Sequence, residues 1–263
     1  MRQIRIDIDG GLFRAYSSLA PRTDAAPAVE PTPVVLIHGI GMSHRYFARL
    51  HREFARSRDV HAIDLPGFGR FGRPRGEFGQ EGMARALAAV LQRLNVPRAV
   101  LIGHSMGAQW IVELARQRRD LAEGVVLIGP VADDERRTLR AQSVALARDT
   151  LGEPPRVNAI VFADYVRCGM PWYLTQLRHM MTYPIEERIA DLSVPVLVVR
   201  GGNDPVAGLD WCRRLRDRAH DGSLVIVPGC RHVVQFAAPR AVASAIDAFL
   251  ATRRRTGHLL DVA

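Results

Sequence analysis

The most constraining feature of the sequence is an apolar run that ends in a serine between glycines, Ala99-Val-Leu-Ile-Gly-His-Ser-Met-Gly-Ala-Gln-Trp110. The run before Gly103 has the pattern of a strand buried on both faces, and the residues from Met106 onward suit a helix. A serine on so sharp a turn needs a strained backbone, and close neighbouring chains leave no room for a β-carbon two positions to either side. This setting predicts Ser105 as a nucleophile lifted clear of a sheet, at a helix N-terminus that favours developing negative charge.

Strand-like runs alternate with stretches of helical period along most of the chain. The expected strands are residues 3–8, 12–16, 34–38, 60–64, 98–103, 125–129, 196–201 and 224–227. The expected helices are residues 44–57, 80–94, 106–119, 208–219 and 239–251. The first two strands surround Asp9-Gly10-Gly11, which favours an antiparallel pair. The rest of the alternation predicts an α/β fold with a mostly parallel sheet covered by helices.

One long segment, residues 131–188, interrupts this alternation because it contains no strong strand pattern. We expect it to form a helical cap inserted into a core made of residues 1–130 and 189–263. The stretch Met170-Pro-Trp-Tyr-Leu174, with Met180 close behind it, is rich in large adaptable side chains. Such a stripe usually packs a cap against the body of a protein, but it also suits the lining of an apolar substrate pocket. The expected pocket residues are Gly39, Trp172, Tyr173, Met180 and Val233.

A serine becomes a strong nucleophile only when a base takes its proton and an acid orients that base. In a strand–turn–helix setting of this kind, the chain order is serine, acid, histidine. Asp204 stands just past one predicted strand, and His232 just past the last one. Both positions are at the carboxyl ends of strands, where ligands bind open α/β sheets. The sequence therefore predicts a catalytic triad of Ser105, Asp204 and His232.

Other acids and histidines are alternatives for these roles. Asp133 and Asp134 follow the strand at 125–129 and could supply the acid instead of Asp204. Asp64 comes too early in the chain and is expected to organise the turn that follows it. His38 and His104 are expected to hold loops in place through hydrogen bonds.

An acyl-transfer site also needs donors for the oxyanion that forms in the transition state. The backbone amide after the nucleophile, that of Met106, is the first expected donor. The second lies in the loop His38-Gly39-Ile40-Gly41, where we expect the amide of Ile40 to serve, with Gly41 as the alternative.

Composition indicates which binding partners and which cellular compartment to expect. All 36 basic residues are arginine and the formal net charge is +9, but the arginines are spread through the chain without interleaved aromatics. We therefore expect a solvated basic surface and no nucleic-acid partner. No apolar run of about 18 residues predicts a membrane span, and the first residues alternate like a strand rather than a secretory signal. Three widely spaced cysteines, Cys168, Cys212 and Cys230, indicate no disulfide framework and favour a reduced, cytoplasmic setting.

Taken together, these motifs resemble the α/β-hydrolase superfamily over essentially the whole chain. The motifs that carry the resemblance are His38-Gly-Ile-Gly41, Asp64-Leu-Pro-Gly-Phe-Gly69, Gly103-His-Ser-Met-Gly107, Gly201-Gly-Asn-Asp-Pro205 and His232-Val-Val-Gln-Phe236. The resemblance implies an eight-stranded, mostly parallel sheet with a helical lid inserted after the sixth strand. Serine at position 105 argues against the haloalkane dehalogenases and epoxide hydrolases of the superfamily, which have aspartate there.

The reaction expected on these grounds is hydrolysis of a carboxylic ester with a small or medium apolar acyl group, through an acyl-enzyme. A small-molecule acyl substrate is expected, with no metal and no cofactor. Cys230-Arg-His-Val-Val-Gln-Phe236 is similar to a region of carbon–carbon hydrolases that act on β-diketone-like ring-cleavage products, although Val233 replaces their usual tryptophan. Lactone or thioester hydrolysis, and a non-catalytic ligand receptor, are further alternatives. Arg167, Arg178 and Arg188 are cap candidates for binding an acidic substrate, or surface residues.

Overall fold

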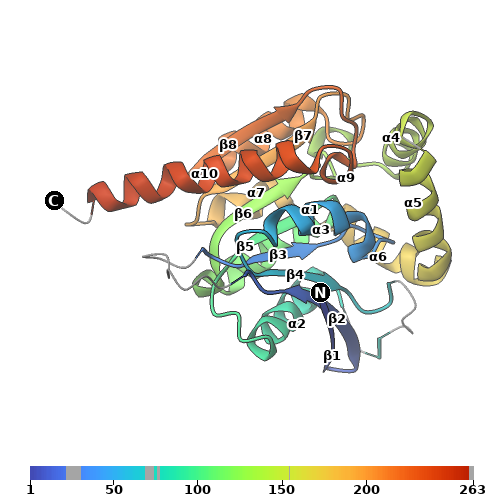
Figure 1. Cartoon of the computed structure of the whole chain (residues 1–263). Helices are drawn as coiled ribbons and strands as arrows, with labels where there is room; N and C mark the ends of the chain where they lie inside the picture. The colour runs from blue at the N-terminus through green and yellow to red at the C-terminus, as the bar shows by residue number, and fades with distance from the viewer. Residues whose placement is uncertain (22–30, 69–73, 76–77, 154, 261–263) are drawn as a thin grey trace.

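The computed structural model describes residues 1–21, 31–68, 74–75, 78–153 and 155–260, with side chains up to residue 253. One eight-stranded sheet runs through the molecule in the order β1-β2-β4-β3-β5-β6-β7-β8 (Figure 1). The strands are β1(Arg2–Ile8), β2(Gly11–Ser18), β3(Val34–Ile37), β4(Val60–Asp64), β5(Ala99–His104), β6(Ala122–Ile128), β7(Val196–Gly201) and β8(Gly222–Val227). In this sheet β2 runs in the opposite direction to the other strands: it pairs antiparallel with β1 and β4, and the remaining pairs are parallel. The predicted α/β class and mostly parallel eight-stranded sheet are confirmed.

The central strands are buried on both faces. Their side chains alternate between two hydrophobic cores, one on each face of the sheet. In β3, Val35 and Ile37 join one core, whereas Val34 and Leu36 join the other. Helices α2(Gln80–Arg93), α3(Met106–Gln117) and α8(Leu209–Arg218) contribute to the first core. Helices α1(Ala48–Phe54) and α10(Pro239–Leu260) contribute to the second. This period-2 division explains why these strands read as continuous apolar runs.

Two predicted helices differ from the structure by more than two residues at an end. The helix expected at 44–57 divides into a 3-10 turn, η1(His44–Phe47), and the shorter α1. The start of η1 is held by Asp64, whose carboxylate accepts from both the backbone N–H and the ring of His44. Helix α10 continues past the predicted end at 251 to residue 260. Within the described part of the chain, no helix is both long and apolar enough to cross a membrane.

In the described residues between β6 and β7, the regular secondary structure is all helix, with no strand. It contains η3(Asp134–Arg136), α4(Leu139–Gly152), α5(Pro155–Cys168), α6(Met170–Thr182), α7(Ile185–Arg188) and η4(Ile189–Asp191). Helices α4 to α6 lie beyond the end of the sheet toward which the β3 and β6 arrows point (Figure 1). Buried amides attach α6 to the body: Gln176 donates to the carbonyl oxygen of Phe78, and Gln109 to that of Met180, both at 2.9 Å.

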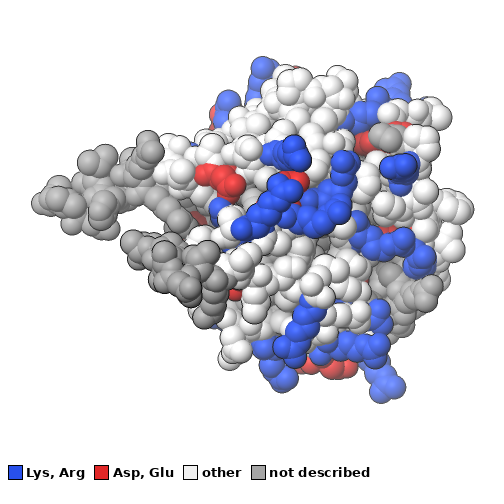
Figure 2. Space-filling view, viewed as in Figure 1, with Lys and Arg blue, Asp and Glu red and all other residues white. Residues whose placement is uncertain are grey.

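The arginines are spread over the surface with acidic residues among them. Figure 2 shows this mixture on one face of the molecule. Several are held in ion pairs, such as Arg58 with Asp247 and Arg253 with Asp221. The three cysteines are free thiols.

Candidate active site

Ser105 stands at the turn between β5 and α3 in a conformation that few non-glycine residues adopt. Its φ is 56° and its ψ is −122°. Its backbone is fixed by two hydrogen bonds: its N–H donates to the carbonyl of Ile128 at 2.9 Å, and its carbonyl accepts from the N–H of Ala108 at 3.0 Å. Strain of this kind persists only where the surroundings enforce it. The predicted strained turn is therefore present.

The glycines around Ser105 are required by the close approach of backbone atoms. A β-carbon at Gly103 would lie 2.3 Å from the carbonyl oxygen of Gly107, and one at Gly107 would lie 2.4 Å from that of Ile37. A β-carbon at Gly39 would lie 2.9 Å from the β-carbon of Ser105. The predicted steric reason for glycine on both sides of the serine is thus confirmed, and Gly39 shares it.

Asp204 and His232 form a buried pair at the carboxyl ends of β7 and β8. His232 Nδ1 lies 2.9 Å from Asp204 Oδ2. The other carboxylate oxygen, Oδ1, accepts from the N–H groups of Val206 and Ala207 at 2.7 and 3.0 Å. A β-carbon at Gly129, whose φ is 53°, would lie 3.0 Å from the imidazole ring, so this glycine leaves the space that the pair occupies.

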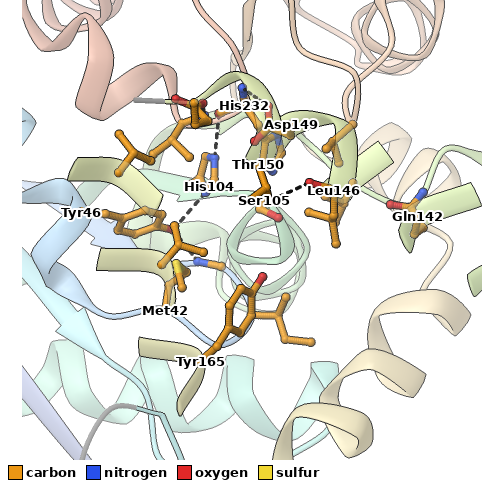
Figure 3. A pocket seen from close by; sticks show the side chains of 18 of the residues that line it. Met42, Tyr46, His104, Ser105, Gln142, Leu146, Asp149, Thr150, Tyr165 and His232 are labelled. Atoms are coloured by element: carbon orange, nitrogen blue, oxygen red, sulfur yellow. Dashed lines mark hydrogen bonds between the residues drawn. The ribbon is translucent and has the colours of Figure 1, made fainter. Parts of the chain in front are cut away.

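The electrostatics of the pair follow from these contacts. Burial would raise the pKa of Asp204, but the charge and hydrogen bond of His232 and the two backbone donors outweigh it and lower the pKa. Burial would likewise lower the pKa of His232, but the nearby carboxylates, Asp204 first, raise it above 6.5. His232 Nε2 is buried without a hydrogen-bond partner among the described residues. Ser105 and His232 line the same cavity (Figure 3).

Two backbone donors are available beside Ser105. The N–H groups of Ile40 and Met106 have no hydrogen-bond acceptor in the described part of the chain. By contrast, the N–H of Gly39 is occupied, because it donates to Tyr46 Oη at 2.6 Å. Ile40 lines the cavity and Met106 is the first residue of α3. This arrangement fits the expected oxyanion donors.

The two other histidines of the region hold loops. His104 is neutral, since burial and the neighbouring His232 lower its pKa to about 3. It accepts from Tyr46 Oη at Nδ1 and donates from Nε2 to the carbonyl of His232, both at 3.0 Å (Figure 3). His38 donates to the carbonyl of Gly39 and accepts from the N–H of Leu65. Sequence reasoning did not find Tyr46, which connects the Gly39 loop to His104; no motif marks it.

The alternative acids lie elsewhere. Asp133 and Asp134 form ion pairs with Arg214. Asp64 pairs with His44, which ties η1 to the end of β4. The structure therefore brings Asp204 to His232 and does not bring these three carboxylates there.

The cavity above Ser105 has a volume of about 400 Å³ and is mainly apolar. Four of the five expected pocket residues line it, namely Gly39, Tyr173, Met180 and Val233. Trp172 was predicted wrongly, because it is not among the lining residues. It is buried against Phe68 at a ring distance of 6.2 Å and covers Gly67. Consecutive residues of a helix point about 100° apart, so α6 turns Tyr173 to the cavity and Trp172 to the body.

The cavity also contains carboxyl groups that the sequence did not reveal. Asp149, at the end of α4, and Glu153, its C-cap, are buried and line the cavity. None of the three candidate cap arginines lines it, and Arg167 is paired with Asp164. Among the described residues, no group of three or more histidine, cysteine or acidic side chains is placed to hold a metal ion.

This geometry agrees with the family that the sequence matches. A model of the Alpha/beta hydrolase family matches residues 34–245, which is most of the chain. The chain belongs to this family. The resemblance inferred from the motifs is therefore confirmed.

Individual relatives in the family are distant. The chain is 28% identical over 242 residues to the dihydrolipoyllysine-residue acetyltransferase component of an acetoin cleaving system from Pseudomonas putida, covering 83% of this chain. It spans only 63% of that protein, less than two thirds of its length. It is 24% identical to the esterase YbfF of Escherichia coli, covering 83% of this chain and 93% of the esterase.

Solved structures show the same fold. The enol-lactonase from Burkholderia xenovorans LB400 superposes with a TM-score of 0.76 at 19% identity, covering 94% of this chain and all of that chain. At this identity the similarity concerns the fold alone. The chain thus has the alpha/beta-hydrolase fold, and its reaction and substrate have to be argued from its own site.

Proposed function

We propose that this protein is a serine hydrolase that cleaves a carboxylic ester with a small or medium, uncharged acyl group. In this mechanism His232 Nε2 takes the hydroxyl proton as Ser105 Oγ attacks the ester carbonyl. The N–H groups of Ile40 and Met106 stabilise the oxyanion, and Asp204 keeps the proton of the imidazole on Nδ1. His232 then protonates the leaving alcohol and activates the water that hydrolyses the acyl-enzyme.

The observation that carries this proposal is the Asp204–His232 hydrogen bond, with Nε2 left unpartnered and with His232 lining the same cavity as the strained Ser105. Each part alone occurs in proteins that catalyse nothing. Acyl transfer requires several parts around one cavity. These are a nucleophile, a base with one free nitrogen, an orienting acid and two free amide donors.

The cavity lining favours an uncharged acyl group. Most of its surface is apolar, including Met42, Val157, Val161 and Met180, and no arginine is among its described lining residues. A carboxylate-bearing substrate, as the carbon–carbon hydrolase alternative would take, therefore has no cationic partner there. The similarity to an E. coli esterase supports the ester as the bond cleaved.

We further propose that residues 131–188 act as the cap of this site. Helices α4, α5 and α6 each contribute lining residues to the cavity, for example Leu146, Val161 and Tyr173. The remaining wall comes from η1 and from the loops after β3, β5, β6, β7 and β8. Acyl specificity is accordingly assigned to the cap, and the chemistry to the core.

Kinetics of Ser105→Ala test the proposal. With p-nitrophenyl esters of rising chain length as substrates, kcat should fall on the order of 10⁴-fold or more. The same panel, extended to a lactone and a vinylogous β-diketone, ranks the three reactions by kcat/KM. Turnover of Ser105→Ala close to wild type would exclude Ser105 as the nucleophile.

A further inference from the structure

Two acidic side chains of α4 are buried in the active-site cavity, and the proposed mechanism does not use them. Asp149 is 5% exposed and Glu153 is 7% exposed. Figure 3 shows Asp149 beside His232. Carboxylates are rarely buried unless they are paired, and buried titratable groups in a cavity mark functional positions.

Both carboxylates bind the backbone of the loop that carries His232. The N–H of His232 donates to Asp149 Oδ1 at 3.1 Å. The N–H of the next residue, Val233, donates to Glu153 Oε1 at 3.0 Å. Because Asp149 and Glu153 are four residues apart, they lie on the same face of α4. They therefore hold two consecutive peptide groups at the proposed base.

A third contact fixes the residue before the histidine to the same turn of α4. The Arg231 guanidinium donates to the carbonyl of Arg148 at 2.5 Å, and its Nε lies 3.6 Å from Asp149 Oδ1. The guanidinium also covers Gly152, where a β-carbon would lie 2.2 Å from Arg231 Cζ. The last turn of α4 thus contacts three consecutive residues of the loop.

We propose that Asp149 and Glu153 are positioning residues, which hold the loop of residues 231–233 so that His232 faces Ser105 only while α4 lies against it. This inference rests on His232 being the base of the proposed function. It connects the cap to the catalytic machinery: a substrate that displaces α4 removes the acceptors of both peptide N–H groups.

The two carboxylates also act on His232 through their charge. The charged and titratable groups around its ring are Asp204 after β7, Asp149 and Glu153 on α4, His104 at the end of β5, and Arg231 and Cys230 in its own loop. Burial lowers the pKa of His232, and Asp204 raises it most, with Asp149 and Glu153 adding to the rise. A residue that only filled space would leave this pKa unchanged.

Paired substitutions separate the two effects. Asp149→Asn and Glu153→Gln keep an oxygen acceptor but remove the charge, whereas alanine at either position removes both. We expect each amide variant to lower the pKa of His232 by roughly half a unit, measured by NMR of the imidazole and by the acidic limb of kcat/KM. Each alanine variant should lose about tenfold or more in kcat, with a smaller change in KM, because the base is displaced.

Stability distinguishes positioning from a structural role. Burial raises the pKa of both carboxyl groups, so their ionised forms cost stability near neutral pH. The amide variants should therefore unfold in urea no more easily than wild type. Asp210→Asn is the control, since this carboxylate on α8 has an 83% exposed side chain; it should change neither the pKa nor kcat.

These experiments distinguish a failure of this inference from a failure of the proposed function. An unchanged His232 pKa in both amide variants, with kcat retained in both alanine variants, would overturn the inference while leaving ester hydrolysis intact. If the NMR pKa falls as expected in a protein whose wild type hydrolyses no ester, the inference about the loop stands and the proposed function fails. Should the alanine variants not fold, the amide variants still decide between these results.

Discussion

Different contacts hold Ser105 and His232 in their conformations. The serine is held at a φ of 56° by backbone hydrogen bonds to Ile128 and Ala108. The histidine instead is held by polar contacts at every side: Asp204 at Nδ1, Asp149 at its N–H and His104 at its carbonyl. Nε2 is the polar group of His232 that these contacts leave free. At the scale of the residue, the site is preorganised to accept one proton.

The elevated pKa of His232 predicts the pH dependence of the wild-type enzyme. A general base must be unprotonated, so kcat/KM should fall as pH decreases through the pKa of His232. Because this pKa is raised above 6.5, the acidic limb should lie above pH 6.5. A pH–rate profile measures it, and a limb below 6.5 would contradict the electrostatic account.

Asp204→Asn tests the orienting acid. An amide at this position can donate to Nδ1, which would leave the ring proton on Nε2 and prevent it from accepting the serine proton. We expect kcat to fall about 10³–10⁴-fold. A loss of less than tenfold in kcat on the p-nitrophenyl esters would show that another group orients His232.

At the scale of the element, the site depends on how closely α3 approaches β3. The carbonyl oxygens of Ile37 and His38 face Gly107 at distances that exclude a side chain. The short distance between α3 and the end of β3 fixes the position of the first turn of α3. It therefore also fixes the direction of the N–H of Met106.

Gly107→Ala should therefore destabilise the fold. The added β-carbon would lie 2.4 Å from the carbonyl oxygen of Ile37, and backbone atoms cannot move aside as a flexible side chain can. We expect a loss of roughly 1–3 kcal/mol in the free energy of unfolding in urea. Gly208→Ala is the matched control, because nothing lies within 4 Å of its β-carbon and its φ is −57°. Equal effects of the two substitutions would refute the steric account.

At the scale of the whole molecule, local patterns predicted the core of the fold and of the site. Buried parallel strands read as continuous apolar runs, the glycines around Ser105 follow from local sterics, and chain order with strand ends indicated Asp204 and His232. Nearby residues in the sequence, or the regular geometry of a parallel sheet, determine these features. They could therefore be predicted from the sequence.

Contacts made by the cap could not be inferred in this way. Asp149 and Glu153 reach a loop about eighty residues later in the chain, and a carboxylate on a helix ordinarily indicates a solvated face. Trp172 and Tyr173 are adjacent and chemically alike, so only the docking of α6 decides which one faces the cavity. Tyr46 lies in a 3-10 turn, and its hydroxyl accepts from the N–H of Gly39 in the loop after β3. The sequence around Tyr46 does not indicate this contact.

The central claim is that Ser105 is the nucleophile of this site. Labelling with a fluorophosphonate followed by peptide mass spectrometry tests it most directly, since the probe reacts with a serine only when a base and an oxyanion hole activate it. The account predicts one adduct, on Ser105, and its loss in Ser105→Ala and strong slowing in Asp204→Asn. An adduct on another residue, or ester turnover by a protein whose Ser105 remains unlabelled, would contradict it.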